Sequence, residues 1–414
     1  MKQLLVSSLS FFCVLQAAIA TSAAVDIRTL SSPDGRIRIT IEFAGAGQKP
    51  RWSATFQERP VLLNCELGIE ATGAKGDLLT GARVVVAKKR VVDERVRVPF
   101  GKSEWARDRF NEHHFILENS TLGAPIGQRT DVIFRCYDDA IAVRYEIPAE
   151  GRETPITIAD ETTSFRPVLT GRLAPPPKIG QISGDRAIAV REPQAFVQYL
   201  ENYKTSHEHV VVPMPYSEIR KGALLDLPIT FLSADGTYVA ITEASLRNYA
   251  GMALMRDEDS DALVCKLTPR ADGTKVVQSL PIKTPWRAVP MKTPWRVVLI
   301  GDRPGVLLES ETIHCLNEPN AIDDTSWIKP GKLTFHWWNG DVYDGKPGEP
   351  MLSFEMSKKY IDFCAKNGIE FHGISSTEGT TDPWYFQTKR GTQPGPDTDV
   401  TRLREGFELE RIRK

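Results

Sequence analysis

The chain has 414 residues, of which 41% are hydrophobic and 25% charged, ordinary values for a globular protein of two or three domains. Its formal net charge is −1 and no basic cluster stands out, so nucleic acid is not an expected partner. The six cysteines are scattered, and their spacing with the seven histidines gives no zinc pattern. After loss of the N-terminal segment five remain, which we interpret as mostly buried thiols.

The first residues have the organisation of a secretory signal peptide. Lys2 gives a weakly positive start, residues 4–18 form an apolar run, and Ala18-Ile19-Ala20 is a small-x-small cleavage signal. Residues 1–20 are therefore predicted to be removed, with cleavage after Ala20. A membrane anchor is the weaker interpretation because the apolar run is short for a span. We expect an exported protein, periplasmic or secreted, that has no membrane association after cleavage.

Between about residue 25 and residue 310, short alternating runs of apolar and polar residues predict β-strands. In residues 36–43, for example, the apolar residues occupy every second position. Asp138-Asp139 separates two such runs as a hairpin turn. No long helical period interrupts them, so a large antiparallel β-sandwich is predicted. The expected strands are 36–43, 83–86, 131–137, 140–147, 187–190, 227–232, 238–242 and 295–300.

After residue 318 the pattern changes to strand, helix and strand. A turn at Pro330-Gly331 leads into a strand-like run at 333–338, which ends on two tryptophans and an amide. Residues 351–367 have the spacing of an amphipathic helix, whose apolar face is expected to carry Met356, Tyr360, Phe363 and Cys364. A second strand is predicted at 369–374. This order predicts a βαβ unit.

A last helix is expected from Asp399 as its N-cap, including Leu403, Phe407, Leu409 and Ile412. Two parallel strands cannot bury both of their faces, so the sequence indicates a (β/α)8 TIM barrel that is started and not finished at Lys414. The expected fold class is a multidomain β plus α/β protein. Its domains are residues 21–318, an N-terminal β-domain, and residues 319–414, a truncated barrel.

Several motifs, in order along nearly the whole chain, resemble those of glycoside hydrolase family 97, bacterial exported α-glycosidases that include α-glucosidases and α-galactosidases. None of them is decisive by itself, but together they are highly specific. The residue before the two tryptophans is His336, where an acid is expected in much of the family. The matching stretches are 32–35, 236–244, 248–252, 293–296, 324–331, 337–339, 360–363 and 367–369.

The resemblance implies an N-terminal β-super-sandwich followed by a (β/α)8 catalytic barrel. It also implies a catalytic calcium ion (Ca2+) between the two, with Glu243 as the metal ligand that the sandwich supplies. Calcium takes several carboxylate and carbonyl oxygens, which suits such a carboxylate. From its spacing alone, Glu243 would be a solvated acid at the end of a strand. The two carboxyl groups that cleave a glycosidic bond come from later barrel strands in the family, so no catalytic residue is expected within this chain.

The end of the first barrel strand is the expected sugar site. Consecutive residues of a strand point to opposite faces, so only one of Trp337 and Trp338 can line the barrel mouth. We favour Trp338 with Asn339 as the sugar-contacting pair. Glu378 follows the second strand, where it is either a substrate contact or an ordinary loop carboxylate. His113-His114 are expected in a solvated loop of the sandwich, with a metal pair as the alternative.

Two functions follow from this reasoning. The first is a calcium-dependent, exported hydrolase of α-glycosidic bonds in oligosaccharides, of which this chain is an incomplete form that does not itself hydrolyse glycosides. The second is a non-catalytic, carbohydrate-binding β-sandwich protein. In both, an α-linked oligosaccharide is the expected partner.

Overall fold

The structure is a computed structural model that divides the chain into two compact units, residues 1–319 and 320–414. The described residues are 25–45, 47–71, 77–98, 101–119, 129–148, 158–168, 193–203, 207–269, 291–335, 354–373, 384–385, 399–403 and 408–414. The expected signal peptide and the expected strand at 187–190 lie outside them.

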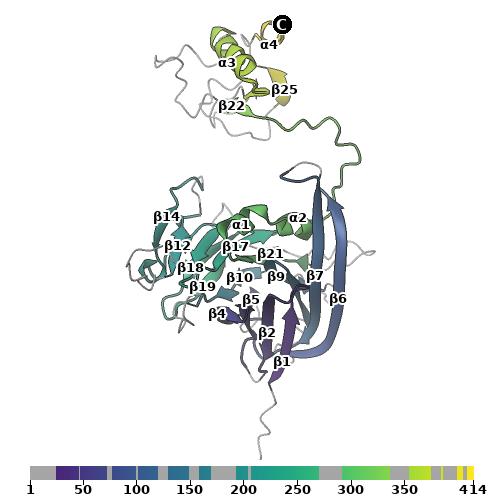
Figure 1. Ribbon diagram of the computed structural model, residues 1–414, viewed down its shortest axis with the longest axis vertical. Helices are drawn as coiled ribbons and strands as arrows, with labels where there is room; N and C mark the ends of the chain where they lie inside the picture. The colour runs from purple at the N-terminus through teal and green to yellow at the C-terminus, as the bar shows by residue number, and fades with distance from the viewer. Residues whose placement is uncertain are drawn as a thin grey trace, which may run out of the picture. The chain divides into compact units, whose positions relative to one another are not determined.

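The first unit is built on a large antiparallel sheet of ten strands (Figure 1). The alternating runs expected near residues 131–147 form the β8–β9 hairpin. The run at 295–300 forms β21, which pairs with β9, and the run at 238–242 forms β17 on the other side of β21. The sheet order is β14 (Val212–Pro215), β12 (Gln194–Val197), β16 (Ile229–Leu232), β17 (Tyr238–Ala244), β21 (Trp295–Gly301), β9 (Ala140–Ile147), β8 (Arg129–Tyr137), β7 (Trp105–Glu118) and β6 (Arg83–Arg97), with β20 (Met291–Lys292) beside β9.

Three smaller sheets complete the first unit, and their strands also pair in antiparallel fashion. One has the order β1 (Asp26–Ser31), β2 (Ile37–Phe43), β3 (Arg51–Phe56) and β4 (Arg59–Glu66). Another has the order β11 (Ser164–Phe165), β19 (Leu263–Leu267), β18 (Met252–Arg256), β15 (Leu224–Leu225) and β13 (Tyr199–Leu200). The third pairs β10 (Ile158–Glu161) with β5 (Ile69–Ala71), and a short 3-10 helix, η1 (Tyr216–Glu218), follows β14.

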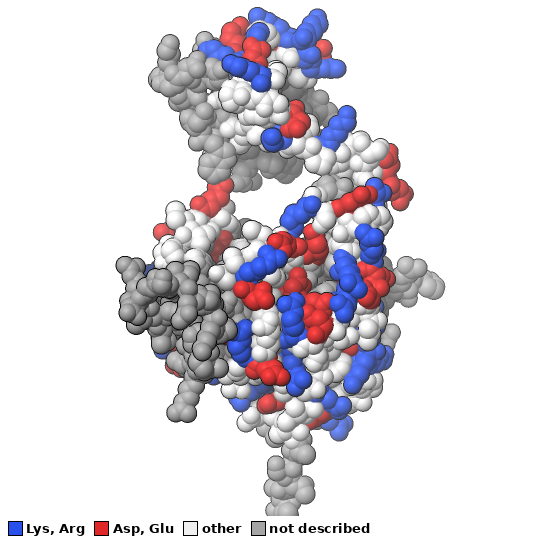
Figure 2. Space-filling view, in the orientation of Figure 1, with Lys and Arg blue, Asp and Glu red and all other residues white. Residues whose placement is uncertain are grey.

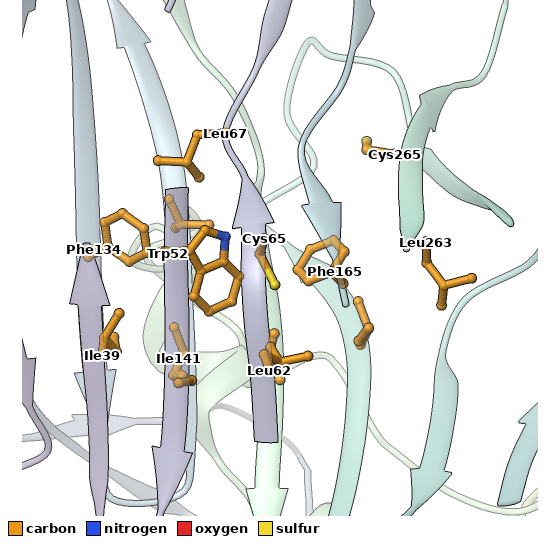
Figure 3. Close-up of a cluster of buried hydrophobic side chains, with 14 of the residues drawn as sticks. Ile39, Trp52, Leu62, Cys65, Leu67, Phe134, Ile141, Phe165, Leu263 and Cys265 are labelled. Carbon is orange, nitrogen blue, oxygen red and sulfur yellow. The ribbon is translucent and has the colours of Figure 1, made fainter. Parts of the chain in front are cut away.

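The main core lies where these sheets meet. Trp52 of β3 is 1% exposed and makes edge contacts with Phe134 of β8 and Phe165 of β11, at ring-centroid distances of 5.9 and 6.2 Å. Figure 3 shows this indole between the two rings, beside Cys65. One buried tryptophan thus joins strands from three sheets, which is the sandwich packing expected from the alternating sequence.

A second core covers the opposite face of the ten-stranded sheet. Phe110, Tyr137 and Trp295 are almost fully buried there, together with Leu316. The cover comes from two short helices, α1 (Pro304–Glu309) and α2 (Thr312–Leu316), which contact β21, β17 and β7 (Figure 1). The central strands of the sheet are consequently buried on both faces, which explains why β21 is apolar at almost every position.

In the second unit, β22 (Leu333–Phe335) and β23 (Phe371–Gly373) pair in parallel and are connected through helix α3 (Phe354–Asn367). This is the expected βαβ order. Met356, Tyr360 and Cys364 are buried on α3 as expected, and Tyr360 stacks on His372 at 4.9 Å. Phe363 is 44% exposed, contrary to expectation.

The prediction of a helix that begins at Asp399 is wrong. Residues Asp399–Leu403 form strand β25, which pairs in antiparallel fashion with β24 (Trp384–Tyr385), and the helix α4 is limited to Leu409–Arg413. Tertiary pairing thus overrides the helical spacing of the apolar residues. Among the residues that the structure describes, no helix is long and apolar enough to span a bilayer.

Candidate functional site

Glu243 lies near the end of β17, directly opposite Arg296 of the neighbouring strand β21. Its carboxylate accepts a hydrogen bond from Arg296, with 2.5 Å between Oε2 and Nη1. The backbone N–H of Met252 also donates to this carboxylate, at 3.2 Å from each oxygen. The Glu243 side chain is 16% exposed, whereas that of Arg296 is fully buried. The carboxylate therefore lies at the boundary between the core and the surface.

Arg296 binds a second carboxylate on its other side. Glu161 of β10 is fully buried and accepts two hydrogen bonds from Arg296, at 2.9 Å from Nε and 2.6 Å from Nη2. This bidentate geometry is the strongest arrangement that a guanidinium makes with a carboxylate. Glu161, Arg296 and Glu243 form one continuous ion network, which we call the carboxylate–arginine triad.

The triad has two ionisable acids and one cation. Burial raises the pKa of Glu243 above its ordinary value, against the opposing effect of Arg296. Burial alone would lower the pKa of Arg296, but Glu161 and Glu243 outweigh it and raise that pKa. With both acids ionised, Glu161 balances the charge of Arg296, and one negative charge is left at Glu243. That is the residue of the three that solvent reaches.

The loop after β17 closes over the triad. Ser245 and Asn248 adopt left-handed backbone angles, with φ values of 58° and 51°. The guanidinium of Arg296 lies 5.9 Å from the centroid of the Tyr249 ring. The Tyr249 hydroxyl is buried and has no hydrogen-bond partner among the described residues. Tyr249 thus excludes water from one side of the triad and strengthens its electrostatic interactions.

Glu243 meets part of what a calcium ion requires. A carboxylate offers about four acceptor positions, and the Arg296 and Met252 hydrogen bonds leave some of them open. Calcium needs about six to eight oxygens. No group of three or more His, Cys, Asp or Glu side chains in the described part of the chain could hold a metal ion. Glu243 accordingly fits the role of one ligand to a shared ion and not that of a complete site.

The other expected site residues are not brought together with Glu243. Trp338, Asn339 and Glu378, as well as Trp337 and His336, lie outside the described residues. The expectation that His113-His114 occupy a solvated loop is wrong, because both lie in the middle of β7. His113 is buried, while Nε2 of His114 lies 2.8 Å from Oδ2 of Asp131. Successive residues of a strand point to opposite faces, so the two rings do not form a metal pair.

The roles of Arg296 and Glu161 are not predicted from the sequence. Arg296 ends the stretch Thr293–Arg296, which the resemblance identifies only as a motif, and no pattern in the sequence predicts Glu161 beside it. The two residues are 135 positions apart. A signal was present, because a charged residue within the apolar run of β21 needs a buried partner of opposite charge.

Comparisons with known proteins identify the family to which the chain belongs. The family model described as Glycosyl-hydrolase 97 N-terminal matches residues 30–175 and 187–319, together more than half of the chain. The chain therefore belongs to glycoside hydrolase family 97, and the matched part is the N-terminal region of that family.

Two curated relatives are similar over most of this chain. A retaining alpha-galactosidase of Bacteroides thetaiotaomicron is 26% identical over 364 residues, which are 83% of this chain and 49% of the relative. A probable retaining alpha-galactosidase of Streptomyces bingchenggensis is 26% identical over 340 residues, covering 82% of this chain and 44% of the relative. The chain thus spans about half the length of these relatives.

Solved structures from the same family have a similar fold. A variant of a Glycoside Hydrolase Family 97 enzyme from Pseudoalteromonas sp. strain K8, in complex with panose, matches with a TM-score of 0.67 and 26% identity. The match covers 90% of this chain and 51% of that one. The same enzyme in complex with acarbose matches with a TM-score of 0.66 and 25% identity.

Proposed function

We propose that this chain belongs to an exported, calcium-dependent enzyme that hydrolyses α-glycosidic bonds in oligosaccharides. The observation that carries the proposal is the family match over residues 30–175 and 187–319. The names of the two curated relatives make α-galactosides the first substrates to test, and the panose complex adds α-glucosides. The apolar N-terminal residues are the basis for proposing export.

In this proposal the sandwich supplies one calcium ligand. Glu243 would hold the ion through the face of its carboxylate that Arg296 and Met252 leave open. Arg296 fixes the direction of the carboxylate, as hydrogen bonds from surrounding residues commonly do for metal ligands. Glu161 neutralises Arg296, so that the cation near the site does not cancel the charge of Glu243. The ion, when bound, would act as a Lewis acid on a substrate oxygen.

The chain's remaining roles are proposed from the resemblance. The β22–α3–β23 unit would be the start of the catalytic barrel, and Trp338, Asn339 and Glu378 would contact the sugar. Bulky rings beside a hydrogen-bonding amide suit the apolar faces and hydroxyl groups of a sugar ring. The acid and base that cleave the bond are not assigned to any residue of this chain.

The test uses the natural protein, isolated from its source with an antibody against the sandwich. We expect it to release nitrophenol from α-galactosides or α-glucosides and not from the β-anomers. A chelator should abolish this activity, and calcium should restore it. Oligosaccharide binding without any hydrolysis would instead support the non-catalytic carbohydrate-binding function.

The role of Glu243 is tested by Glu243→Gln, introduced at the native locus. The variant should need about tenfold or more calcium for half-maximal activity, because the neutral amide is a poorer calcium ligand. The control is Glu66→Gln, which removes an exposed carboxylate near Arg51 in the four-stranded sheet. An unchanged calcium requirement in the Glu243 variant would remove Glu243 from the metal site.

A further inference from the structure

Strand β6 is an unusually long edge strand. It runs for fifteen residues, Arg83–Arg97, and among the described strands it pairs only with β7. Figure 1 shows it at the outer edge of the ten-stranded sheet. The backbone groups on its outer side are therefore available to another strand. Such an edge is a ready template for pairing with a further chain.

The side chains of β6 are exposed over almost its whole length. Val91, in the middle, is 75% exposed, which is unusual for a branched apolar residue in a strand. On one side of it lie Lys88 and Lys89, and on the other side lie Asp93 and Glu94. Figure 2 shows basic and acidic side chains close together over the part of the molecule that carries β6 and β7.

Two copies of one edge strand can pair symmetrically only about a two-fold axis perpendicular to the sheet. Residues that lie opposite each other in an antiparallel pair are on the same face of the sheet, and successive residues alternate between the faces. The axis must therefore lie where one residue is opposite its own copy, and not midway between two successive residues. With Val91 on the axis, Lys89 lies opposite Asp93 of the second copy, and Lys88 lies opposite Glu94. Each pair occurs twice by symmetry. Directly opposite Cβ atoms are about 5 Å apart, which lets these charges interact.

No other centre near the middle of β6 has this complementarity. An axis through Arg90 places this arginine against its own copy. An axis through Val92 places Lys89 against Arg95. About Val91, by contrast, no like charges are opposed anywhere between residues 85 and 97, and Val86 meets Val96.

The charges that would pair are also suitably placed in the single chain. Lys88, Lys89 and Glu94 form no salt bridge within the described residues. Asp93 accepts two hydrogen bonds from Arg107, both at 2.8 Å, and Nε of Arg109 lies 3.8 Å from its Oδ2; acceptor positions remain for a further cation. We propose that β6 docks in antiparallel fashion against β6 of a second copy of this chain, with Val91 on the two-fold axis.

Sedimentation equilibrium of the full chain tests the proposal. The unaltered chain should approach a dimer at about 100 µM and dissociate on dilution. The paired change Lys88→Glu and Lys89→Glu places like charges opposite each other and should weaken self-association about tenfold or more. The control is Lys358→Glu with Lys359→Glu on α3, which makes the same charge change outside β6 and should leave the dimer intact.

Mixing two variants separates repulsion from misfolding. Asp93→Lys with Glu94→Lys should also be monomeric by itself. An equimolar mixture of this variant with the Lys88→Glu, Lys89→Glu variant restores opposite charges across the interface, so a heterodimer should form. A mixture that stays monomeric, or a single variant that stays dimeric, would overturn the proposal.

The register is tested by crosslinking. The five described cysteines are buried, so Val91→Cys introduces an accessible thiol. This thiol lies beside its own copy in the proposed dimer and should form an intermolecular disulfide with oxidised glutathione. Val85→Cys would lie about 40 Å from its copy and should not crosslink. Equal crosslinking of the two variants would contradict Val91 as the centre.

Discussion

Glu243 and Arg296 lie directly opposite each other on β17 and β21, and their charged atoms are 2.5 Å apart. Because Arg296 also binds Glu161 of β10, the same guanidinium fastens the β10–β5 ladder to the ten-stranded sheet. A buried cation with two carboxylates is sensitive to the loss of its centre, since each acid would then remain without a partner.

Replacing Arg296 with methionine should therefore be strongly destabilising. The fully buried Glu161 and the largely buried Glu243 would both lose their counter-charge, and we expect the free energy of unfolding to fall by about 3–5 kcal/mol. Urea denaturation measures the change. The control is Arg303→Met, which removes an equally bidentate but exposed pair with Glu309 and should lower the stability far less. Equal losses in both variants would show that burial of the triad contributes nothing.

Glu112 should make stability depend on pH. Burial alone would raise its pKa, but Arg135 at 2.8 Å and Arg90 at 3.0 Å outweigh it and hold the pKa below its ordinary value. The folded state thus binds the proton less tightly than the unfolded state does. The stabilisation is present above the unfolded pKa of about 4.3 and is lost as the pH falls through the folded pKa.

Glu112→Gln should reduce the free energy of unfolding by about 1–3 kcal/mol near neutral pH. The difference from the unaltered chain should shrink as the pH is lowered through the acid range. Unfolding curves at a series of pH values measure it. Glu118→Gln on the same strand is the control, because its exposed carboxylate is 3.9 Å from Arg83 and should matter little. A difference that grows toward acid pH would refute the assigned direction.

Gly301, at the end of β21, marks a close approach to α1. A Cβ placed there would lie 2.6 Å from Cβ of Val306 and below 3 Å from both of its methyl carbons. Gly301→Ala should displace the helix and destabilise the fold by about 1–3 kcal/mol. Gly251→Ala is the comparison, since its nearest atom is 3.6 Å away, and thermal unfolding of the two variants should separate them. Similar stabilities of the two variants would mean that α1 can move away from β21 without loss of stability.

The buried cysteines should be unreactive in the folded protein. Burial raises the pKa of Cys65 to about 12, and it does the same for Cys315. The thiolate is the reactive form, so an aromatic disulfide reagent should label these residues only after denaturation. Peptide mapping identifies the labelled positions. Rapid labelling of either residue in the native protein would be inconsistent with its burial.

Much of the sandwich could be predicted because its strands carry a clear period of two. In β2, Ile37, Ile39, Ile41 and Phe43 face the core and alternate with less buried residues. The β8–β9 hairpin was recognised in the same way, from alternating runs on either side of a turn. These are the places where local sequence and burial agree.

The long β6–β7 ribbon could not be predicted in full. Only residues 83–86 of β6 were expected, although the strand continues to Arg97. Its later residues are charged on both faces, so the alternation that identifies a half-buried strand is absent. Backbone pairing with β7 over fourteen registered positions maintains it instead. For the same reason the sequence predicts a loop, and not a strand, around His113-His114.

The triad shows a different limit of sequence reasoning. The family resemblance identifies Glu243, and the alternation near residue 240 predicts its position at a strand end. Its environment depends on Arg296 and Glu161, which only the tertiary fold brings together. Charge alone does not identify a buried partner that is more than a hundred positions away.

Strand β21 lies between β17 and β9, and it pairs Arg296 with Val143 on one side and with Glu243 on the other. The ribbon of β6 to β9 is synthesised long before residue 295, yet its inner edge meets its neighbour only when β21 has been made. The large sheet thus consists of two parts, β14 to β17 on one side and β9 to β6 on the other, which β21 joins late in the sequence. Such non-local strand pairing is slow to form. Until β21 takes its place, the facing edges of β17 and β9 lack this partner, and each is open to pairing with a wrong strand.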